Sequence, residues 1–128
     1  MYNTGSYNTA AGGRSLENNT TSQYNTAVGY QALYSNTSGG ANVALGAGAL
    51  LNNTISNYNT AVGFNALYTN SSQSGLIAIG YGSLYNNTTG QGNTSVGYLS
   101  QYLNTYGNYN TSVGFNALYN NTTGTNNK

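Results

Sequence analysis

The stretch YNTAVGYQALYSNTSGG, residues Tyr24–Gly40, returns with few changes as YNTAVGFNALYTNSSQS at 58–74 and as YNTSVGFNALYNNTTGT at 109–125. More divergent copies of the same length occupy the rest of the chain, so that it divides without gaps into repeats 7–23, 24–40, 41–57, 58–74, 75–91, 92–108 and 109–125. Such a fixed short period predicts a solenoid in which each repeat forms one coil. Residues 1–6 are then a lead-in, 7–125 one solenoid domain and 126–128 a tail. Repeat positions are numbered 1–17, with Tyr24 at position 1.

The composition leaves few groups for catalysis. The 128 residues include no Cys and no His, and the charged side chains are those of Arg14, Glu17 and Lys128. General acid–base catalysis needs a titratable side chain, and one side-chain carboxylate cannot form the pair that glycoside hydrolysis uses. Without Cys there is neither a disulfide framework nor a thiolate metal site. The sequence therefore predicts a protein that is not an enzyme and has no catalytic residue, metal site or cofactor.

The charge and hydropathy patterns also narrow the partners. A net charge of +1 provides no basic surface for phosphates, so nucleic-acid binding is not expected. No apolar run reaches the length of a membrane span, so membrane insertion is not expected either. The first residues lack the pattern of a signal peptide. Export would then depend on another route or on a signal outside this sequence.

Disorder is the main alternative to a folded solenoid. Leu, Ile, Val and Phe make up about 16% of the chain, which lies below the usual level for folded domains. A disordered chain of that kind also has a high net charge, which this one lacks, although a low-complexity segment rich in Asn, Thr, Gly and Tyr remains an alternative. Neither state needs particular residues at fixed places over seven copies, so the periodicity favours the folded solenoid.

Two repeat positions never change. Position 6 is Gly in every copy, and only Gly adopts a positive φ without steric penalty, so a tight corner is expected there. These corner glycines are Gly12, Gly29, Gly46, Gly63, Gly80, Gly97 and Gly114. Position 13 is Asn in every copy, and Asn favours turns and, in stacked coils, amide ladders along the axis. These turn or ladder asparagines are Asn19, Asn36, Asn53, Asn70, Asn87, Asn104 and Asn121.

The residues between these positions predict two short strands per coil. Positions 2–6 read as one strand, because position 4 is always small and position 5 is aliphatic, as in Ala27 and Val28. Side chains alternate faces along a strand, and we expect positions 3 and 5 to point inward and position 4 outward. Positions 8–12 predict a second strand with the Leu of position 10 inward. A helix is the competing interpretation of this half, but five residues are too few for a stable one. The fold class expected is all-β, a β-solenoid or β-roll of seven coils.

Aromatic residues form three stripes along the predicted rod, at positions 1, 7 and 11. They either stack between coils or form a contact surface, because Tyr is enriched at interfaces. The candidate interface aromatics are Tyr24, Tyr34, Tyr58, Tyr68, Tyr85, Tyr102, Tyr109 and Tyr119. Each coil has few large apolar side chains, so stability is expected to come also from stacking or from other chains, associated as a parallel homotrimer or an end-to-end filament.

Two repeats depart from the pattern. The first carries Gly13, Arg14 and Glu17 where other copies have aromatic or neutral residues, which predicts a cap or junction. The sixth reads Tyr-Leu-Ser-Gln-Tyr-Leu at 98–103, so its Leu is displaced from position 10. A local distortion of that coil is expected.

Six of the seven turns carry an Asn-x-Ser/Thr sequon at position 12 or 13. Such sequons are glycan acceptors in exported proteins of cells with the required enzymes, but a chain this rich in Asn and Thr also produces them by chance. The possible glycosylation sites are Asn18, Asn19, Asn36, Asn52, Asn70, Asn86, Asn87, Asn120 and Asn121.

The strands Val43-Ala44-Leu45-Gly46 and Ile77-Ala78-Ile79-Gly80 resemble the head repeats of trimeric autotransporter adhesins, whose signature is aliphatic-Ala-aliphatic-Gly. The segment 25–33, NTAVGYQAL, resembles repeats of phage and bacterial tail-fibre-like surface proteins. The resemblance covers 7–125, although the repeat here is longer than in a typical adhesin head. It implies a β-roll in which three parallel chains share an axis, and a role as a fibre shaft or adhesive head.

The function favoured by the sequence is an extracellular structural fibre or filament segment on a cell or virion surface, adhesive towards a host surface or polysaccharide. The alternative is an ice- or polysaccharide-binding β-solenoid that uses rows of Thr or Tyr at coil spacing. A catalytic domain is the least favoured, because the acid–base groups are missing.

Overall fold

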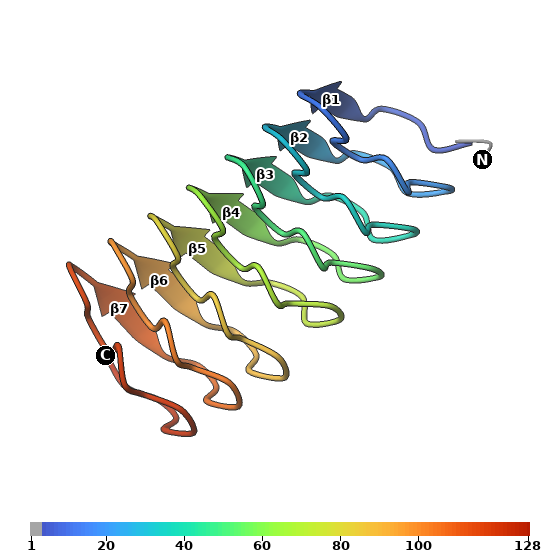
Figure 1. Cartoon of the computed structure of the whole chain (residues 1–128). Coiled ribbons are helices and arrows are strands. Elements are labelled where there is room, and N and C mark those ends of the chain that lie inside the picture. Colours follow the sequence, from blue (N-terminus) through green and yellow to red (C-terminus); the bar gives the residue numbers. More distant parts are fainter. Residues whose placement is uncertain (1–3) are drawn as a thin grey trace.

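The structure, a computed structural model, describes residues 4–128, so the first half of the lead-in, residues 1–3, lies outside it. These residues form a β-solenoid of parallel strands joined in sequence order and contain no helix, which confirms the expected fold class. Figure 1 shows the strands side by side along one edge of a rod, with the N- and C-terminal ends at opposite ends of the stack. The strands are β1 Thr9–Ala11, β2 Thr26–Val28, β3 Val43–Leu45, β4 Thr60–Val62, β5 Ile77–Ile79, β6 Thr94–Val96 and β7 Thr111–Val113.

The strands pair at the repeat length. Thr26 of β2 lies opposite Thr9 of β1, and Thr60 of β4 lies opposite Val43 of β3, each 17 residues away. Backbone hydrogen bonds continue this stacking beyond the strands, for example from Leu33 N to Ala49 O at 3.0 Å. Each coil therefore pairs with its neighbours over much of its circumference, which compensates for strands only three residues long.

The strand faces are the reverse of those expected. Position 4, represented by Ala27, is fully buried, whereas position 5 is exposed, with Val28 at 41%. The Thr of position 3, such as Thr26, is half-buried on the same outward face. Position 2 explains the difference: Asn25 is buried, and alternation from it sends positions 2 and 4 inward. The sequence interpretation was wrong because it paired the inward face with the most aliphatic residue.

The second half of the coil is not a strand. It consists of hydrogen-bonded turns, from Ala32 N to Gly29 O at 3.3 Å, from Tyr34 N to Gln31 O at 3.3 Å and from Asn36 N to Leu33 O at 3.2 Å. Gln31 and Leu33, at positions 8 and 10, have φ values of 57° and 51°. A positive φ at the third residue is the geometry of a type II turn. The predicted strand over positions 8–12 was wrong because successive left-handed residues bend the chain there.

The corner at position 6 is confirmed, with φ between 121° and 139° in all its glycines. Close approach adds a second constraint: a Cβ on Gly63 would lie 2.5 Å from Gly80 O in the next coil. Both the left-handed backbone and this contact require Gly.

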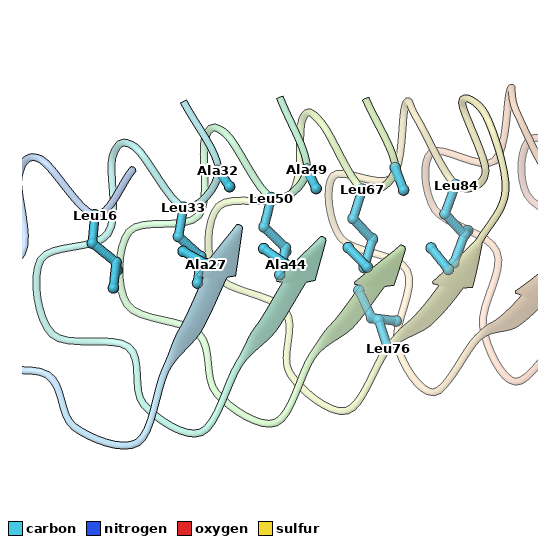
Figure 2. Packing of buried hydrophobic residues seen from close by; sticks show 13 residues of the cluster. Leu16, Ala27, Ala32, Leu33, Ala44, Ala49, Leu50, Leu67, Leu76 and Leu84 are labelled. Carbon is cyan, nitrogen blue, oxygen red and sulfur yellow. The ribbon is translucent and has the colours of Figure 1, made fainter. Parts of the chain in front are cut away.

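The core is a single column of leucines between the turns and the strands. Leu33, Leu50, Leu67 and Leu84 are fully buried, and Figure 2 shows them pointing towards the strands, above the small residues of position 4. The inward position of this Leu is confirmed. The core also explains the alanines, because a coil this narrow has no room for a larger inward residue on the strand.

The sixth coil keeps this geometry. Gln101 occupies position 10, is fully buried and has a φ of 49°, close to that of the leucines. Its Nε2 donates hydrogen bonds to Thr94 O and Ser112 Oγ, each at 2.9 Å. The predicted distortion is therefore wrong: a polar side chain of similar length replaces Leu and donates to one carbonyl and one hydroxyl across the core, while its buried Oε1 has no partner among the described residues.

Candidate interaction surfaces

The asparagines of position 13 form the expected ladder inside the coil. Nδ2 of Asn53 donates to Oδ1 of Asn36 at 3.0 Å, and Nδ2 of Asn121 donates to Oδ1 of Asn104 at 3.1 Å. The same amides close the turn of their own coil, as from Asn36 Nδ2 to Gly39 O at 2.9 Å. These buried amides are thus hydrogen-bonded to their neighbours, which is what burial of a polar group requires, and the ladder is interrupted between Asn70 and Asn87.

A second ladder, at position 2, was not predicted. The backbone N of Asn42 donates to Oδ1 of Asn25 at 2.9 Å, and Asn25 Nδ2 donates to Gly39 O at 2.9 Å. The signal was present in the sequence, because position 2 is Asn in every repeat except at Leu76. In the coil before Leu76, the buried Oδ1 of Asn70 has no hydrogen-bond partner among the described residues.

The ladders bear on the predicted glycosylation. A glycan replaces a hydrogen on Nδ2 and needs open space beside it, whereas the ladder amides are buried and donate through Nδ2. Glycans therefore do not fit the folded coil at Asn19, Asn36, Asn70 and Asn87. The remaining sites are half-buried or exposed, and their glycosylation stays a prediction. They are Asn18, Asn52, Asn86 and Asn120, whereas the half-buried Asn121 belongs to the ladder and donates through Nδ2 to Asn104 Oδ1 and Gly124 O.

The aromatic stripes stack between coils. In the position-11 column, Tyr68 and Tyr85 lie 4.9 Å apart between ring centroids with an interplanar angle of 1°. In the position-7 column, Phe64 and Tyr81 lie 5.4 Å apart at 13°. Both columns continue to the seventh coil, ending at Phe115 and Tyr119. Burial raises the pKa of Tyr85, and the neighbouring Tyr68 and Tyr102 raise it further.

The position-1 tyrosines behave differently. Tyr7 and Tyr24 stack at 5.1 Å, but the column is then interrupted by Ala41 and Gly75. Tyr58 is consequently 72% exposed and Tyr109 57%. The candidate interface aromatics therefore separate into a half-buried set in the position-11 column and an exposed set, Tyr24, Tyr58 and Tyr109, of which Tyr24 also stacks on Tyr7.

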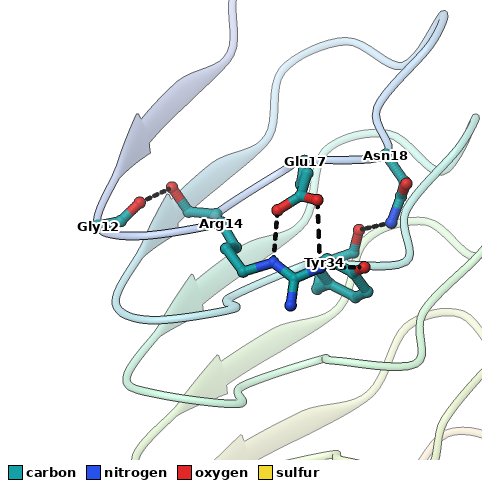
Figure 3. Close-up of polar contacts among 6 residues, drawn as sticks. Gly12, Arg14, Glu17, Asn18 and Tyr34 are labelled. Atoms are coloured by element: carbon teal, nitrogen blue, oxygen red, sulfur yellow. Dashed lines mark hydrogen bonds and ion pairs between the residues drawn. The ribbon is translucent and has the colours of Figure 1, made fainter. Parts of the chain in front are cut away.

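The charges of the first coil lie at the N-terminal end of the position-11 column. Arg14 Nε donates to a Glu17 oxygen at 2.7 Å, and Arg14 Nη2 donates to the Tyr34 hydroxyl at 2.6 Å. The guanidinium carbon lies 4.5 Å from the Tyr34 ring centroid, as Figure 3 shows. The ion pair lowers the pKa of Glu17. A planar cation thus occupies the place of an aromatic ring at the start of the stack.

The outward face of the sheet is an apolar strip. Positions 3 and 5 lie on it, and its exposed aliphatic members include Leu45 at 37%, Ile79 at 38% and Val113 at 73%. Thr9, Thr26, Thr60, Thr94 and Thr111 alternate there with Val43 and Ile77. Contiguous exposed apolar surface of this kind marks an interaction site.

Two hollows lie between the position-7 and position-11 columns, each beside a glycine of position 8. One, of about 280 Å³, is lined by Tyr30, Ala47, Gly48, Leu51 and Phe64, together with Gln31, Asn65 and Tyr68. The other, of about 220 Å³, lies at Gly82 between Tyr81 and Tyr102. Both are small and open, and each is walled by aromatic rings.

The described part of the chain contains no cluster of three or more His, Cys, Asp or Glu side chains able to hold a metal. Within residues 4–128, no helix has the length and apolarity to cross a membrane. Comparison of the chain with protein families, with curated proteins and with solved structures found no match.

Proposed function

We propose that the chain is a structural fibre segment that associates with copies of itself through the outward face of its sheet and works outside the cell or on a virion surface. The observation that carries this proposal is the exposed aliphatic strip, which runs along the rod from Val28 to Val113. Covering such side chains with identical ones contributes roughly 1.5–3 kcal/mol for each that becomes fully buried. A stack of equivalent coils also supplies length and a repeated surface, which a fibre needs.

The geometry favours association through the outward face of the sheet over association only through the two ends of the rod. A flat strip repeated every 17 residues can meet a parallel copy in the same register, so that each coil contributes equally. A parallel dimer about the strip is the simplest such arrangement, and a parallel homotrimer requires the strips of three chains to meet about one axis. The open edges of β1 and β7 offer end-to-end contacts in addition, since unpaired strand edges are templates for pairing.

Sedimentation velocity tests the proposal. We expect the wild-type chain to sediment as a multiple of its 13.3 kDa mass, and the doubly substituted V28K/V62K chain to sediment as a monomer with an unchanged circular dichroism spectrum. The matched control is T88K, which places a charge on the exposed turn edge instead. A monomeric wild-type chain at micromolar concentration would overturn the proposal. Assembly that persists in the double variant would assign association to the ends.

Ice or polysaccharide binding is the second candidate, because the threonines of position 3 lie outward on a flat sheet at coil spacing. Val43 and Ile77 interrupt this row, and their exposure adds to the apolar strip, which favours self-association. Thermal hysteresis of a freezing solution separates the two functions.

A further inference from the structure

Between coils two and seven, the position-7 column lacks one ring, at Ala47. Tyr30 precedes this gap by one coil and Phe64 follows it by one coil, whereas Phe64, Tyr81, Tyr98 and Phe115 stack without interruption. Tyr30 and Phe64 belong to coils two apart, and two strand spacings amount to about 10 Å. The rings of Tyr30 and Phe64 therefore bound a slot at coil three, and the slot has the depth of one ring.

The floor and sides of the slot are set by small residues. Ala47 and Gly48 lie below it, and Leu51 replaces the ring of the position-11 column on one side. The hollow measured there, about 280 Å³, is the larger of the two on this face of the rod. It combines apolar walls with the side-chain amides of Gln31 and Asn65, which is the composition of small-molecule sites: mostly apolar walls with a few polar groups.

The chain itself shows that a flat group completes such a stack. At the start of the position-11 column, where coil one has Glu17 instead of an aromatic residue, the Arg14 guanidinium lies 4.5 Å from the Tyr34 ring. No residue of coil three performs this role for the position-7 column, because position 7 is Ala and position 8 is Gly there.

We propose that the slot at Ala47, between the rings of Tyr30 and Phe64, binds one neutral pyranose ring of a glycan. The faces of aromatic rings are electronegative, so they attract the C–H faces that a pyranose presents on both sides. Its hydroxyl rim then reaches the amides of Gln31 and Asn65. Within the described part of the chain, no charged side chain lines the hollow, which favours a neutral sugar. This slot is separate from the sheet face, so it does not depend on self-association.

The test uses the full chain and a panel of neutral hexasaccharides of glucose, galactose, mannose and N-acetylglucosamine, with binding followed by saturation-transfer NMR and titration. At least one member is expected to bind the wild-type chain. A47Y fills the slot with the ring that other coils carry, so it should weaken that binding at least about tenfold while raising the melting temperature. T88K is the control: it changes an exposed side chain on the turn edge, outside the lining of the slot, and it should leave binding unchanged.

Three results would overturn the proposal. The first is no binding of any panel member at about 10 mM sugar, a concentration that detects even millimolar dissociation constants. The second is equal binding by the wild-type chain and A47Y, which would place the sugar elsewhere. The third is binding of p-cresol in the absence of sugar binding, which would assign the slot to an aromatic ligand. Sedimentation of the same samples reports self-association separately, so the two proposals fail independently.

Discussion

At the scale of single residues, the coil depends on a few positions where the backbone leaves almost no choice. Glycine at position 6 combines a left-handed φ with contact against the next coil, whereas Gly75 has a φ of 71° and no atom within 4 Å of a Cβ placed on it. These two kinds of glycine separate the cost of the backbone conformation from the cost of the collision.

We expect G63A to lower the free energy of unfolding by more than about 3 kcal/mol, because the new methyl group collides with the backbone of Gly80 and the left-handed conformation adds its own penalty. G75A should cost only about 1 kcal/mol, from the conformational term alone. Urea denaturation followed by circular dichroism measures both. Similar losses in the two variants would show that contact between coils is unimportant at the corner.

The amide ladder makes a second prediction at this scale. N53D replaces a donor with an acceptor, so its oxygen would face Asn36 Oδ1 and Ser56 O, the present partners of Nδ2. Ser56 Oγ and Asn70 Nδ2 would still donate to the other oxygen of the carboxylate. We expect a loss of about 3 kcal/mol or more at pH 7, because the new oxygen of the buried charge faces two acceptors and has no donor. Protonation at about pH 3 restores a donor and should recover part of the loss.

The control for this variant is N120D, on an exposed side chain one place before the ladder position. Its stability should change by less than about 0.5 kcal/mol at either pH. An N53D chain as stable as the wild type at pH 7 would mean that the ladder carries no net stabilisation.

At the scale of the strand, the decisive feature is which face is inward. We expect A61V to destabilise the chain by about 1–3 kcal/mol, because the fully buried methyl of Ala61 fills the space below the leucine column and overpacking forces strain. The neighbouring V62A should cost little in the monomer, since Val62 lies on the outward face. Denaturation of dilute samples, with sedimentation to establish the species present, distinguishes them. A larger loss of stability in V62A than in A61V would support the strand orientation expected from hydrophobicity alone.

The reversed strand faces show which parts of the fold can be predicted from the sequence and which cannot. The period, the corner at Gly29 and the ladder at Asn36 are predictable because each coil imposes the same constraint again. The strand faces are not, because a buried polar Asn25 and an exposed Val28 invert the usual relation between hydrophobicity and burial. The left-handed Leu33 gives no local signal either, since leucine seldom adopts that conformation. The slot at Ala47 becomes apparent only when the neighbouring coils are stacked in the structure, because residues of three coils line it.

At the scale of the whole molecule, the scarcity of charge predicts a flat dependence of stability on pH. No side chain titrates between about pH 5 and pH 9. The ion pair lowers the pKa of the exposed Glu17, so its small contribution is present above the unfolded pKa and is lost as the pH falls through the folded one. Burial raises the pKa of Tyr85, so the free energy of unfolding stays constant below about pH 10 and falls above it.

Urea midpoints measured from about pH 3 to pH 12 check this profile. A plateau between about pH 5 and 9 with a decline on the alkaline side is expected, and Y85F should reduce that alkaline decline. A loss of stability that begins between about pH 5 and pH 9 would contradict the assignment of the titrating groups.

The later coils contain buried hydroxyl groups whose hydrogen bonds do not repeat from coil to coil, unlike most contacts of the stack. Ser83 Oγ bonds Ser95 Oγ at 2.8 Å, Ser100 Oγ and Ser112 Oγ lie 2.6 Å apart, and Gln101 joins Ser112. Nearly identical layers can be assembled in the wrong order, because a slip of one whole coil preserves most of the pairing. Only polar partners with a single correct match distinguish the native alignment, as isolated polar residues do in coiled coils. These hydroxyls therefore specify the register between coils that are otherwise nearly identical, so that one alignment of the stack is favoured over the others.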